Sequence, residues 1–278
     1  MRVTIIILAT FIFAVFALAQ SPSKAGDEVA STSAILHSGG VSPLNPQDDR
    51  ILIVLDSEGV FGGNYSSQYE DSFDRINYTD YEVVTSAPDY DEMVNYEFVF
   101  WTTFDDWWTN SGFNATNQSD VSAFLDEGDK FFMLMGQDAI YGSGFTSFYK
   151  DYLGVDSVVE DVYYDVDYIN MSGASGTFCE GISGGFMASI LYSANNFYSD
   201  DLTPTADAME LFITDENYTT CVAYDSGTFK TSFATTEYGC ADGDDLLDDI
   251  MLAHLQWFGM SPTIIDSSSV GVVKALFK

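Results

Sequence analysis

The chain has 278 residues, of which 46% are hydrophobic and 15% aromatic, so it can bury a sizeable core and is not a disordered protein. Its formal net charge is −34, from 43 acidic and 9 basic residues. This excess argues against nucleic-acid binding through phosphate neutralisation and against docking on anionic lipid. The least specific interpretation of the charge is solubility, in an exterior where salt or divalent cations screen the self-repulsion.

The N-terminus predicts an export signal. Arg2 precedes an uncharged apolar run over residues 3–18, and Ala17-Leu18-Ala19 fits the small-x-small pattern of a cleavage site. We therefore expect residues 1–19 to be a signal peptide and the mature chain, secreted or at the cell surface, to begin at Gln20. The alternative is an uncleaved anchor, although the run is short for the ~20 residues of a membrane span.

Residues 20–49 are rich in Ser, Gly, Pro and Ala without apolar periodicity, which predicts a flexible mature N-terminus. Strands and helices then alternate. Strands are expected at Ile51–Leu55, Tyr81–Val84, Glu97–Phe104 and Phe131–Met135, and helices at Ser66–Tyr78, Pro88–Tyr96, Asn117–Glu127 and Gly144–Leu153. This alternation predicts an α/β fold, a mainly parallel sheet with helices on both faces, with ligands at the carboxyl ends of the strands.

The pattern after Val155 predicts a β-rich C-terminal extension of the same domain, which is expected to span residues 50–260. An antiparallel strand is expected at Val158–Ile169, and three further strands are expected at Ala208–Thr214, Thr219–Tyr224 and Thr228–Glu237, followed by a helix at Asp244–Phe258 that Gly259 closes. Residues 171–187 are rich in Gly and Ser. Residues 261–278 are expected to be a tail or a linker stub.

Several segments together resemble class I glutamine amidotransferase-like domains, which have a flavodoxin-like α/β fold. They are "ILIVLDSEG", "EFVFWTTF", "VSAFLDEGDKFFMLMGQDAIYG" and "FYKDYLGV", with "YSDDLTPTADAMELF", "TSFATTEYG" and "LLDDIMLAHLQWFG" in the places of the late strands and the final helix. The similarity is to the divergent kind of domain found in exported bacterial proteins. It covers about residues 50–260.

The resemblance also assigns family positions in this chain. Catalytic members carry a Cys nucleophile in G-x-C-x-G after the fourth strand, and a late strand brings a His and a Glu. In "MGQDA" the nucleophile position falls on Gln137 or Asp138, Glu237 holds the acidic position, and a Thr replaces the His. The resemblance therefore implies a pseudoenzyme that acts as a secreted binding or structural module, and it disfavours enzyme activity.

Carboxylates at the predicted strand ends support an alternative. Asp56, Glu58, Asp105, Asp106, Asp138 and Glu237 could all approach one rim. Paired carboxylates in a partly desolvated cleft can act as the acid and base of a hydrolase. They can also bind Ca²⁺ through oxygen ligands, with Asp56, Asp138 and Glu237 as the metal candidates. The less specific interpretation is that so acidic a chain carries carboxylates over its whole surface.

A pair of tryptophans offers a third hypothesis. Trp107 and Trp108 follow the third predicted strand, where adjacent aromatic rings could stack on a glycan or anchor a cell-surface protein. The simpler alternative is packing against a neighbouring loop or helix. The candidates for ligand binding are therefore Asp56, Glu58, Trp107, Trp108 and Asp138.

The cysteines and histidines carry weaker signals. In an exported protein, Cys179, Cys221 and Cys240 could form one disulfide and leave one thiol, and the sequence does not choose among the pairings. With only His37 and His254, a Cys/His zinc site is not expected. His254 lies on the apolar stripe of the last predicted helix, which favours a core role.

Six Asn-x-Ser/Thr sequons occur in the chain, and they matter only in a host with glycosylation machinery. They begin at Asn64, Asn77, Asn114, Asn117, Asn170 and Asn217. Sequons also arise by chance in a chain that is rich in these residues.

Overall fold

The structure is a computed structural model that describes residues 51–56, 66–104, 113–137, 139–141, 143–163, 168–187, 189–190, 194–195 and 198–262. The predicted signal peptide, the predicted flexible N-terminus and most of the predicted tail lie outside these residues. Within the described ranges, we find no helix that is both long and apolar enough to span a bilayer.

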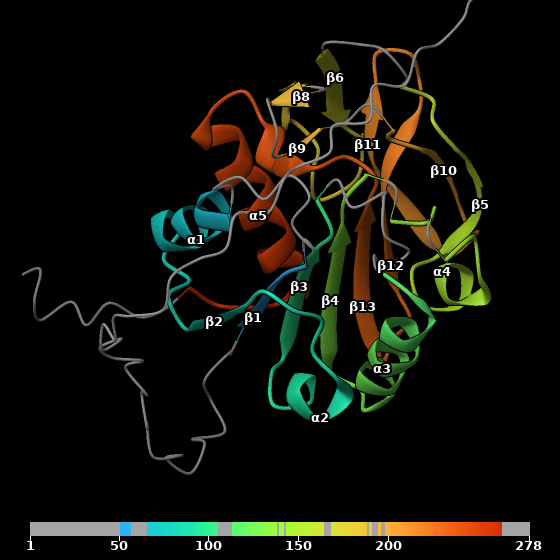
Figure 1. The fold of residues 1–278 in the computed structure, drawn as a ribbon. Coiled ribbons are helices and arrows are strands. Elements are labelled where there is room, and N and C mark those ends of the chain that lie inside the picture. Colours follow the sequence, from blue (N-terminus) through green and yellow to red (C-terminus); the bar gives the residue numbers. More distant parts are fainter. Residues whose placement is uncertain are drawn as a thin grey trace, which may run out of the picture. The chain divides into compact units, whose positions relative to one another are not determined.

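A nine-stranded sheet forms the centre of the fold (Figure 1). In spatial order its strands are β2 (Tyr81–Val84), β1 (Ile51–Leu55), β3 (Phe98–Thr102), β4 (Lys130–Met135), β13 (Phe229–Ala234), β12 (Thr219–Asp225), β11 (Ala208–Thr214), β6 (Tyr168–Gly173) and β7 (Ser183–Met187). Neighbours from β2 to β13 pair in parallel, and neighbours from β13 to β7 pair antiparallel. The predicted α/β fold, a parallel sheet with a β-rich C-terminal extension, is confirmed.

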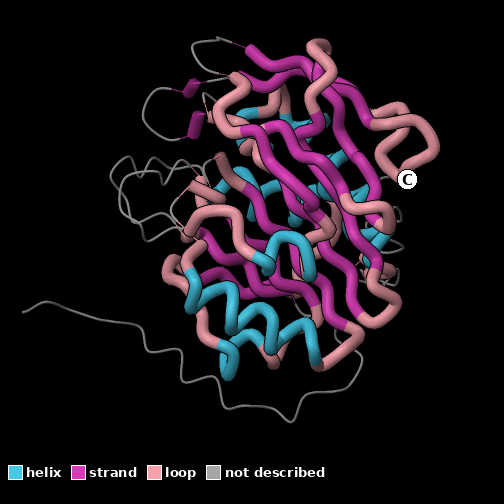
Figure 2. The backbone as a smooth tube through the Cα atoms, turned by 90° about the vertical axis from the view of Figure 1, so that its right-hand side faces the viewer, coloured by secondary structure: helices cyan, strands magenta, loops and turns pink. Residues whose placement is uncertain are grey.

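Helices cover both faces of the sheet, and the strands between them appear together in Figure 2. The helices α1 (Ser66–Arg75) and α5 (Asp244–Phe258) pack on one face, and α2 (Tyr90–Met93), α3 (Ala115–Asp126) and α4 (Ser147–Asp151) pack on the other. Each residue of β1 is buried, with Ile53 facing the first core cluster and Val54 the second. Because both faces of β1 are buried, the run "ILIVL" is apolar throughout and does not alternate between apolar and polar residues.

Polar contacts fix the positions of two helices. Arg75 at the end of α1 makes two hydrogen bonds of 2.8 Å to the Asp248 carboxylate of α5, and Ser72 Oγ donates to the same carboxylate at 2.7 Å.

A capping box forms the start of α3. The side chain of Asn114 accepts hydrogen bonds from backbone N–H groups of the first turn, and the side chain of Asn117 accepts from Asn114 N–H. This capping box starts α3 two residues before the predicted boundary.

The prediction of one strand over Val158–Ile169 is wrong. The structure has β5 (Val155–Val159), which pairs with β10 (Asp201–Pro204), and a separate strand β6. Asp161 has a φ of 58° between them, and its N–H donates to Asp200 Oδ1 at 3.0 Å. A local turn therefore interrupts the apolar alternation, because an acidic side chain distant in sequence supplies its hydrogen-bond acceptor.

Other short elements were not predicted. The Gly- and Ser-rich residues 171–187 include the end of β6 and all of β7, and Asp201–Pro204 forms β10. Two short strands, β8 (Ser189–Ile190) and β9 (Ala194–Asn195), pair with each other, and η1 (Tyr238–Cys240) is a 3₁₀ turn. Glycine-rich strands carry little apolar signal, because neighbouring side chains supply their packing.

In this structure Cys179, Cys221 and Cys240 are buried free thiols, and the possible disulfide stays a prediction. The three cysteines come from different elements: a loop after β6, strand β12 and the 3₁₀ turn η1. Cys221 Sγ lies 3.5 Å from Ser232 Oγ, and burial raises the pKa of Cys221 to about 11. Burial thus keeps this thiol in its protonated, unreactive form.

Candidate functional site

The carboxyl ends of four parallel strands meet at one edge of the sheet. The last pairs in register are Leu55 with Thr102, Thr102 with Met135, and Met135 with Ala234. The residues that follow continue the ladder: Asp56 N–H donates to Thr102 O at 3.0 Å, Thr103 N–H to Met135 O at 2.9 Å, and Gly136 N–H to Ala234 O at 3.1 Å. The sheet therefore brings Asp56, Gly136 and the residues after Ala234 to the edge predicted for the site.

The turn after β4 contains a glycine that no other residue can replace without movement. Gly136 has a φ of 142°, and a Cβ atom there would lie 2.2 Å from Thr103 Oγ1. The ends of β3 and β4 approach so closely here that only glycine, which has no Cβ atom, fits at the first position of the turn after β4.

Gln137 occupies the position that the resemblance gives to the nucleophile, and its side chain is 0% exposed. Its Oε1 accepts from Tyr198 N–H at 3.2 Å. Its Nε2 is buried and makes no hydrogen bond in the described part of the chain. The other candidate for this position, Asp138, lies outside the described residues.

Glu237 is also fully buried, at 0% exposed. Thr102 Oγ1 donates to its Oε2 at 2.7 Å, Gly239 N–H donates to its Oε1 at 3.1 Å, and Tyr69 OH also hydrogen-bonds to Oε1. Burial raises the pKa of Glu237 to about 8, although the Gly239 hydrogen bond opposes the shift. At neutral pH this carboxyl group is therefore mostly protonated.

This geometry corrects the expectation that Glu237 lies at an open rim as a metal ligand. Both of its oxygens are engaged inside the protein. Tyr69 OH also accepts from Gly239 N–H at 2.8 Å and lies 3.1 Å from Met135 Sδ. The network joins α1, β3, β4 and the chain after β13, which is the arrangement of a structural polar cluster.

The Thr pair before Glu237 is likewise bonded within the protein. Thr235 Oγ1 donates to the Asp200 carbonyl at 2.7 Å, and Thr236 Oγ1 lies 3.5 Å from Ser199 Oγ. The side chain of Asp200 is nearly buried, and burial raises its pKa to about 7. A Thr hydroxyl cannot replace a histidine base near neutral pH.

Sequence reasoning missed Tyr69 and Asp200 as members of this edge. Tyr69 was predicted only as a residue of the helix at Ser66–Tyr78. No local signal distinguishes them, because their partners are distant in sequence: Tyr69 and Glu237, for example, are 168 positions apart.

The remaining predicted residues are only partly described. Asp56 is buried at the end of β1, while Glu58, Asp105, Asp106, Trp107 and Trp108 lie outside the described residues. Among the residues that the structure places, no three His, Cys, Asp or Glu side chains converge closely enough to hold a metal ion. The Ca²⁺ site that includes Asp138 stays a prediction.

His254 has the core role that was predicted. It is buried, with Nδ1 2.8 Å from Ile250 O and Nε2 3.1 Å from Ser232 Oγ. Burial lowers the pKa of His254 to about 4, so the ring is neutral at physiological pH.

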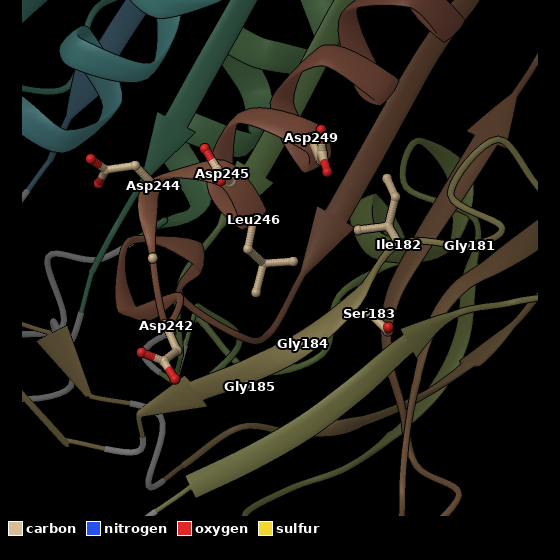
Figure 3. Close-up of a pocket in the computed structure, with 11 residues that line it drawn as sticks. Gly181, Ile182, Ser183, Gly184, Gly185, Asp242, Asp244, Asp245, Leu246 and Asp249 are labelled. Carbon is tan, nitrogen blue, oxygen red and sulfur yellow. The ribbon is translucent and has the colours of Figure 1, made fainter.

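A pocket of about 560 Å³ lies between β7 and the start of α5 (Figure 3). Gly184 and Gly185 form one side, and the acidic lining residues are Asp242, Asp244, Asp245 and Asp249. Asp242 Oδ2 accepts from Tyr168 OH at 2.8 Å. Of the proposed site residues that the structure describes, Asp56, Gln137 and Glu237 do not line this pocket, and Asp244 and Asp245 form the acidic first turn of α5.

No protein-family model matches the chain, and no curated protein sequence matches it. Solved structures of similar fold include the mmIFT52 N-terminal domain, with 16% identity, a TM-score of 0.51, and coverage of 78% of this chain and 100% of that domain. A ThuA-like protein from Bacteroides uniformis ATCC 8492 has 10% identity and a TM-score of 0.50, with coverage of 77% of this chain and 94% of that one.

A glutamine amidotransferase from Thermotoga maritima also matches, with 10% identity, a TM-score of 0.42, and coverage of 77% of this chain and 87% of that one. At such identities, similarity reports the fold alone. The function of this chain therefore has to be inferred from its own residues.

Proposed function

We propose that the chain is a non-catalytic domain of amidotransferase-like fold, which serves as a binding or structural module of a secreted or cell-surface protein. The observation that supports this most is the buried amide of Gln137 in the nucleophile position. An amide cannot form the thioester that a Cys thiolate forms. Loss of both nucleophile and base typically costs ~10⁴–10⁶ in rate.

The rest of the edge supports the same role. Thr235 and Thr236 provide no base, and they bond to the segment that contains Ser199 and Asp200. Glu237 is held by Tyr69, Thr102 and Gly239 in a buried cluster. In this proposal, the edge of the sheet where catalytic members carry their reactive residues has a structural role, because its buried hydrogen bonds position the surrounding strands and helices.

The two alternative functions have less support. A carboxylate hydrolase needs an accessible acid and base, whereas Asp56 and Glu237 are both buried. Sugar binding by Trp107 and Trp108 stays a prediction from sequence, since both residues lie outside the described ranges.

The extracellular part of the proposal is supported by the N-terminal sequence. Residues 1–19 have the charge, apolar run and small residues of a cleavable leader. Expression of the full chain in a secretion-competent host, followed by N-terminal sequencing of the medium fraction, tests it. A mature start at Gln20 supports export, and retention of the uncleaved chain in the cell contradicts it.

Ammonia release from glutamine tests the non-catalytic role. We expect the purified chain to release no more ammonia than buffer, while an active amidotransferase in the same assay does. The variant Gln137→Cys should also be inactive, because a thiol without a base restores only part of the machinery. Ammonia release by the unmodified chain that heat abolishes and Gln137→Ala removes would overturn the proposal.

The same preparations distinguish the hydrolase alternative. A panel of chromogenic esters and glycosides should show no turnover with the unmodified chain. Turnover that disappears in Asp56→Asn but persists in the exposed control Glu127→Gln would favour the hydrolase.

A further inference from the structure

We propose that Asn77, Asn170 and Asn217 are acceptor sites for N-linked glycans on the exported chain. Each begins an Asn-x-Ser/Thr sequon, and each is exposed on the folded surface. The inference rests on export, which is part of the proposed function, and adds a modification to it.

The reaction needs one co-substrate, an oligosaccharide linked to a lipid through pyrophosphate. The Asn side-chain nitrogen forms a bond to the anomeric carbon of the sugar, and the bond from that carbon to the phosphate oxygen breaks. The lipid pyrophosphate leaves with the bonding electrons, and a base of the transferase takes one amide proton. The transfer involves no oxidation or reduction.

The sequence contains many such sites for its composition. More than half of its Asn residues begin a sequon, although Ser and Thr are a small minority of all residues. Three of the six sequons share the form Asn-Tyr-Ser/Thr, at Asn64, Asn77 and Asn217. The frequency alone does not say at which sequons the folded protein can carry a glycan. The structure distinguishes the exposed sequons from those whose Asn side chains are used in the fold.

Asn77 and Asn217 both lie in turns. Asn77 follows α1 with a φ of 65°, and Asn217 lies between β11 and β12 with a φ of 69°. Exposed Asn residues in such left-handed turn positions project away from the regular elements and can carry a bulky group. The hydroxyl residue of the first sequon, Thr79, is exposed too.

Asn170 lies on β6, and its side chain is on the solvent side of that strand while the neighbouring Ile169 and Met171 are buried. Ser172 of the sequon is exposed on the same side. The Asn170 carbonyl accepts from Asp215 N–H at 3.2 Å, which places this sequon close to the turn that contains Asn217. Two of the proposed glycans would therefore project from the same end of the antiparallel strands.

Two other sequons are used by the fold instead. Asn114 Oδ1 accepts from Thr116 N–H at 2.8 Å and from Asn117 N–H at 3.3 Å as the cap of α3. Asn117 is 5% exposed, and its Oδ1 accepts from Asn114 N–H at 3.0 Å. A glycan bonds to the side-chain nitrogen, which Asn117 cannot bring to the surface while its side chain stays buried in this capping box, so folded protein should carry no glycan at Asn117. The capping contacts of Asn114 use its Oδ1 and do not by themselves exclude a glycan there. Asn64 lies outside the described residues.

The test is secretion of the full chain from eukaryotic cells, in an Asn64→Gln background, with its own leader and in parallel with a heterologous leader. Glycan removal by an amidase that converts the linked Asn to Asp, followed by peptide mass spectrometry, identifies each site. We expect occupancy at Asn77, Asn170 and Asn217. Asn77→Gln, Asn170→Gln and Asn217→Gln should each remove one glycan, whereas Asn117→Gln should remove none.

Secreted, folded protein without glycans at the three proposed sites, or with a glycan at Asn117, would overturn the inference. The two leaders separate this result from a failure of export. If only the heterologous leader secretes the chain, the export prediction fails and the glycosylation inference falls with it, even when the three sites are occupied.

Discussion

Gln137 and Glu237 mark the positions where the family resemblance places reactive groups, and both side chains are enclosed by the protein. Gln137 bonds to Tyr198 N–H, and Glu237 bonds to Thr102 and Gly239. A buried acid that stays protonated can keep its hydrogen bonds without the cost of a buried charge. At this scale, the residues stabilise the edge of the sheet.

The pKa of Glu237 predicts a pH dependence of stability. Its folded pKa of about 8 lies above the ordinary glutamate pKa of 4.5, so the folded state binds more protons than the unfolded state between these values. Its stabilising contribution is therefore complete below about pH 4.5 and is lost as the pH rises through about 8. The slope is at most about 1.4 kcal/mol per pH unit for one proton.

Urea denaturation of Glu237→Gln from pH 5 to 9 checks this prediction. The unfolding free energy of the unmodified chain should decrease toward pH 9, and that of the variant should decrease less. The unfolding free energy of the exposed control Glu127→Gln should decrease as much as that of the unmodified chain. Identical pH profiles for Glu237→Gln and the unmodified chain would show that this carboxyl group does not titrate as inferred.

The close approach at Gly136 gives a second prediction at this scale. Gly136→Ala should lower the unfolding free energy by about 2 kcal/mol or more, because the new Cβ meets Thr103 Oγ1 in addition to the backbone strain. The matched control is Gly176→Ala, where φ is +84° but no atom lies within 4 Å. Equal losses in the two variants, measured by urea denaturation, would contradict the proposed contact.

Residue reasoning from sequence found the turn glycine, because it follows a recognisable apolar strand. It did not find Tyr69 or Asp200. Their roles depend on hydrogen bonds between elements distant in sequence, such as the one from Asp161 N–H to Asp200. Local propensity has no information about such pairs.

At the scale of elements, the two helices on one face of the sheet are joined by a defined ionic contact. The Arg75 guanidinium binds the Asp248 carboxylate through two nitrogens, and the carboxylate also accepts from Ser72. Such a two-point contact orients α1 against α5 more precisely than a single hydrogen bond. The contact therefore helps to hold α1, and with it Tyr69, in position.

A double-mutant cycle between Arg75→Gln and Asp248→Asn measures this contact. We expect a coupling energy of about 1 kcal/mol at low salt, decreasing as salt is added, since both groups are partly exposed. Arg75→Gln combined with the exposed control Asp91→Asn should show additive changes. A coupling energy near zero in the main cycle would show that packing alone positions the helices.

The elements themselves were predictable where apolar patterns are long. The parallel strands and α5 were identified, since buried runs and a 3.6-residue stripe persist over several turns. The break between β5 and β6, and the strand β7, were not. The first is a turn stabilised from elsewhere in the chain, and the second contains Gly184 and Gly185, which have no side chains to form a pattern.

At the scale of the whole molecule, the net charge of −34 is the dominant property. Self-repulsion of this size favours expansion of the chain, and it is screened over ~10 Å at 0.1 M salt but only over ~30 Å at 0.01 M. We therefore expect the Tm to rise by several degrees from 0.01 M to 0.5 M NaCl. A Tm that does not change would show that the charges are too widely spaced to matter.

The same experiment tests the predicted Ca²⁺ site when CaCl₂ and NaCl are compared at equal ionic strength. A larger rise with CaCl₂ that Asp56→Asn and Asp138→Asn both remove would support a specific site. If these variants respond like the control Asp225→Asn, calcium acts only by general screening.

The central claim is that Gln137, one of the two residues onto which the resemblance places the nucleophile, is sealed inside the protein, and thiol labelling of Gln137→Cys tests it most directly. Under native conditions, a maleimide should not modify this variant beyond the unmodified chain, whose three cysteines are buried. The matched variant Tyr141→Cys, at a side chain 61% exposed in the same connection, should react completely within the same time. Rapid native labelling of Gln137→Cys, with its far-UV circular dichroism unchanged, would show that the position is open and would contradict the account.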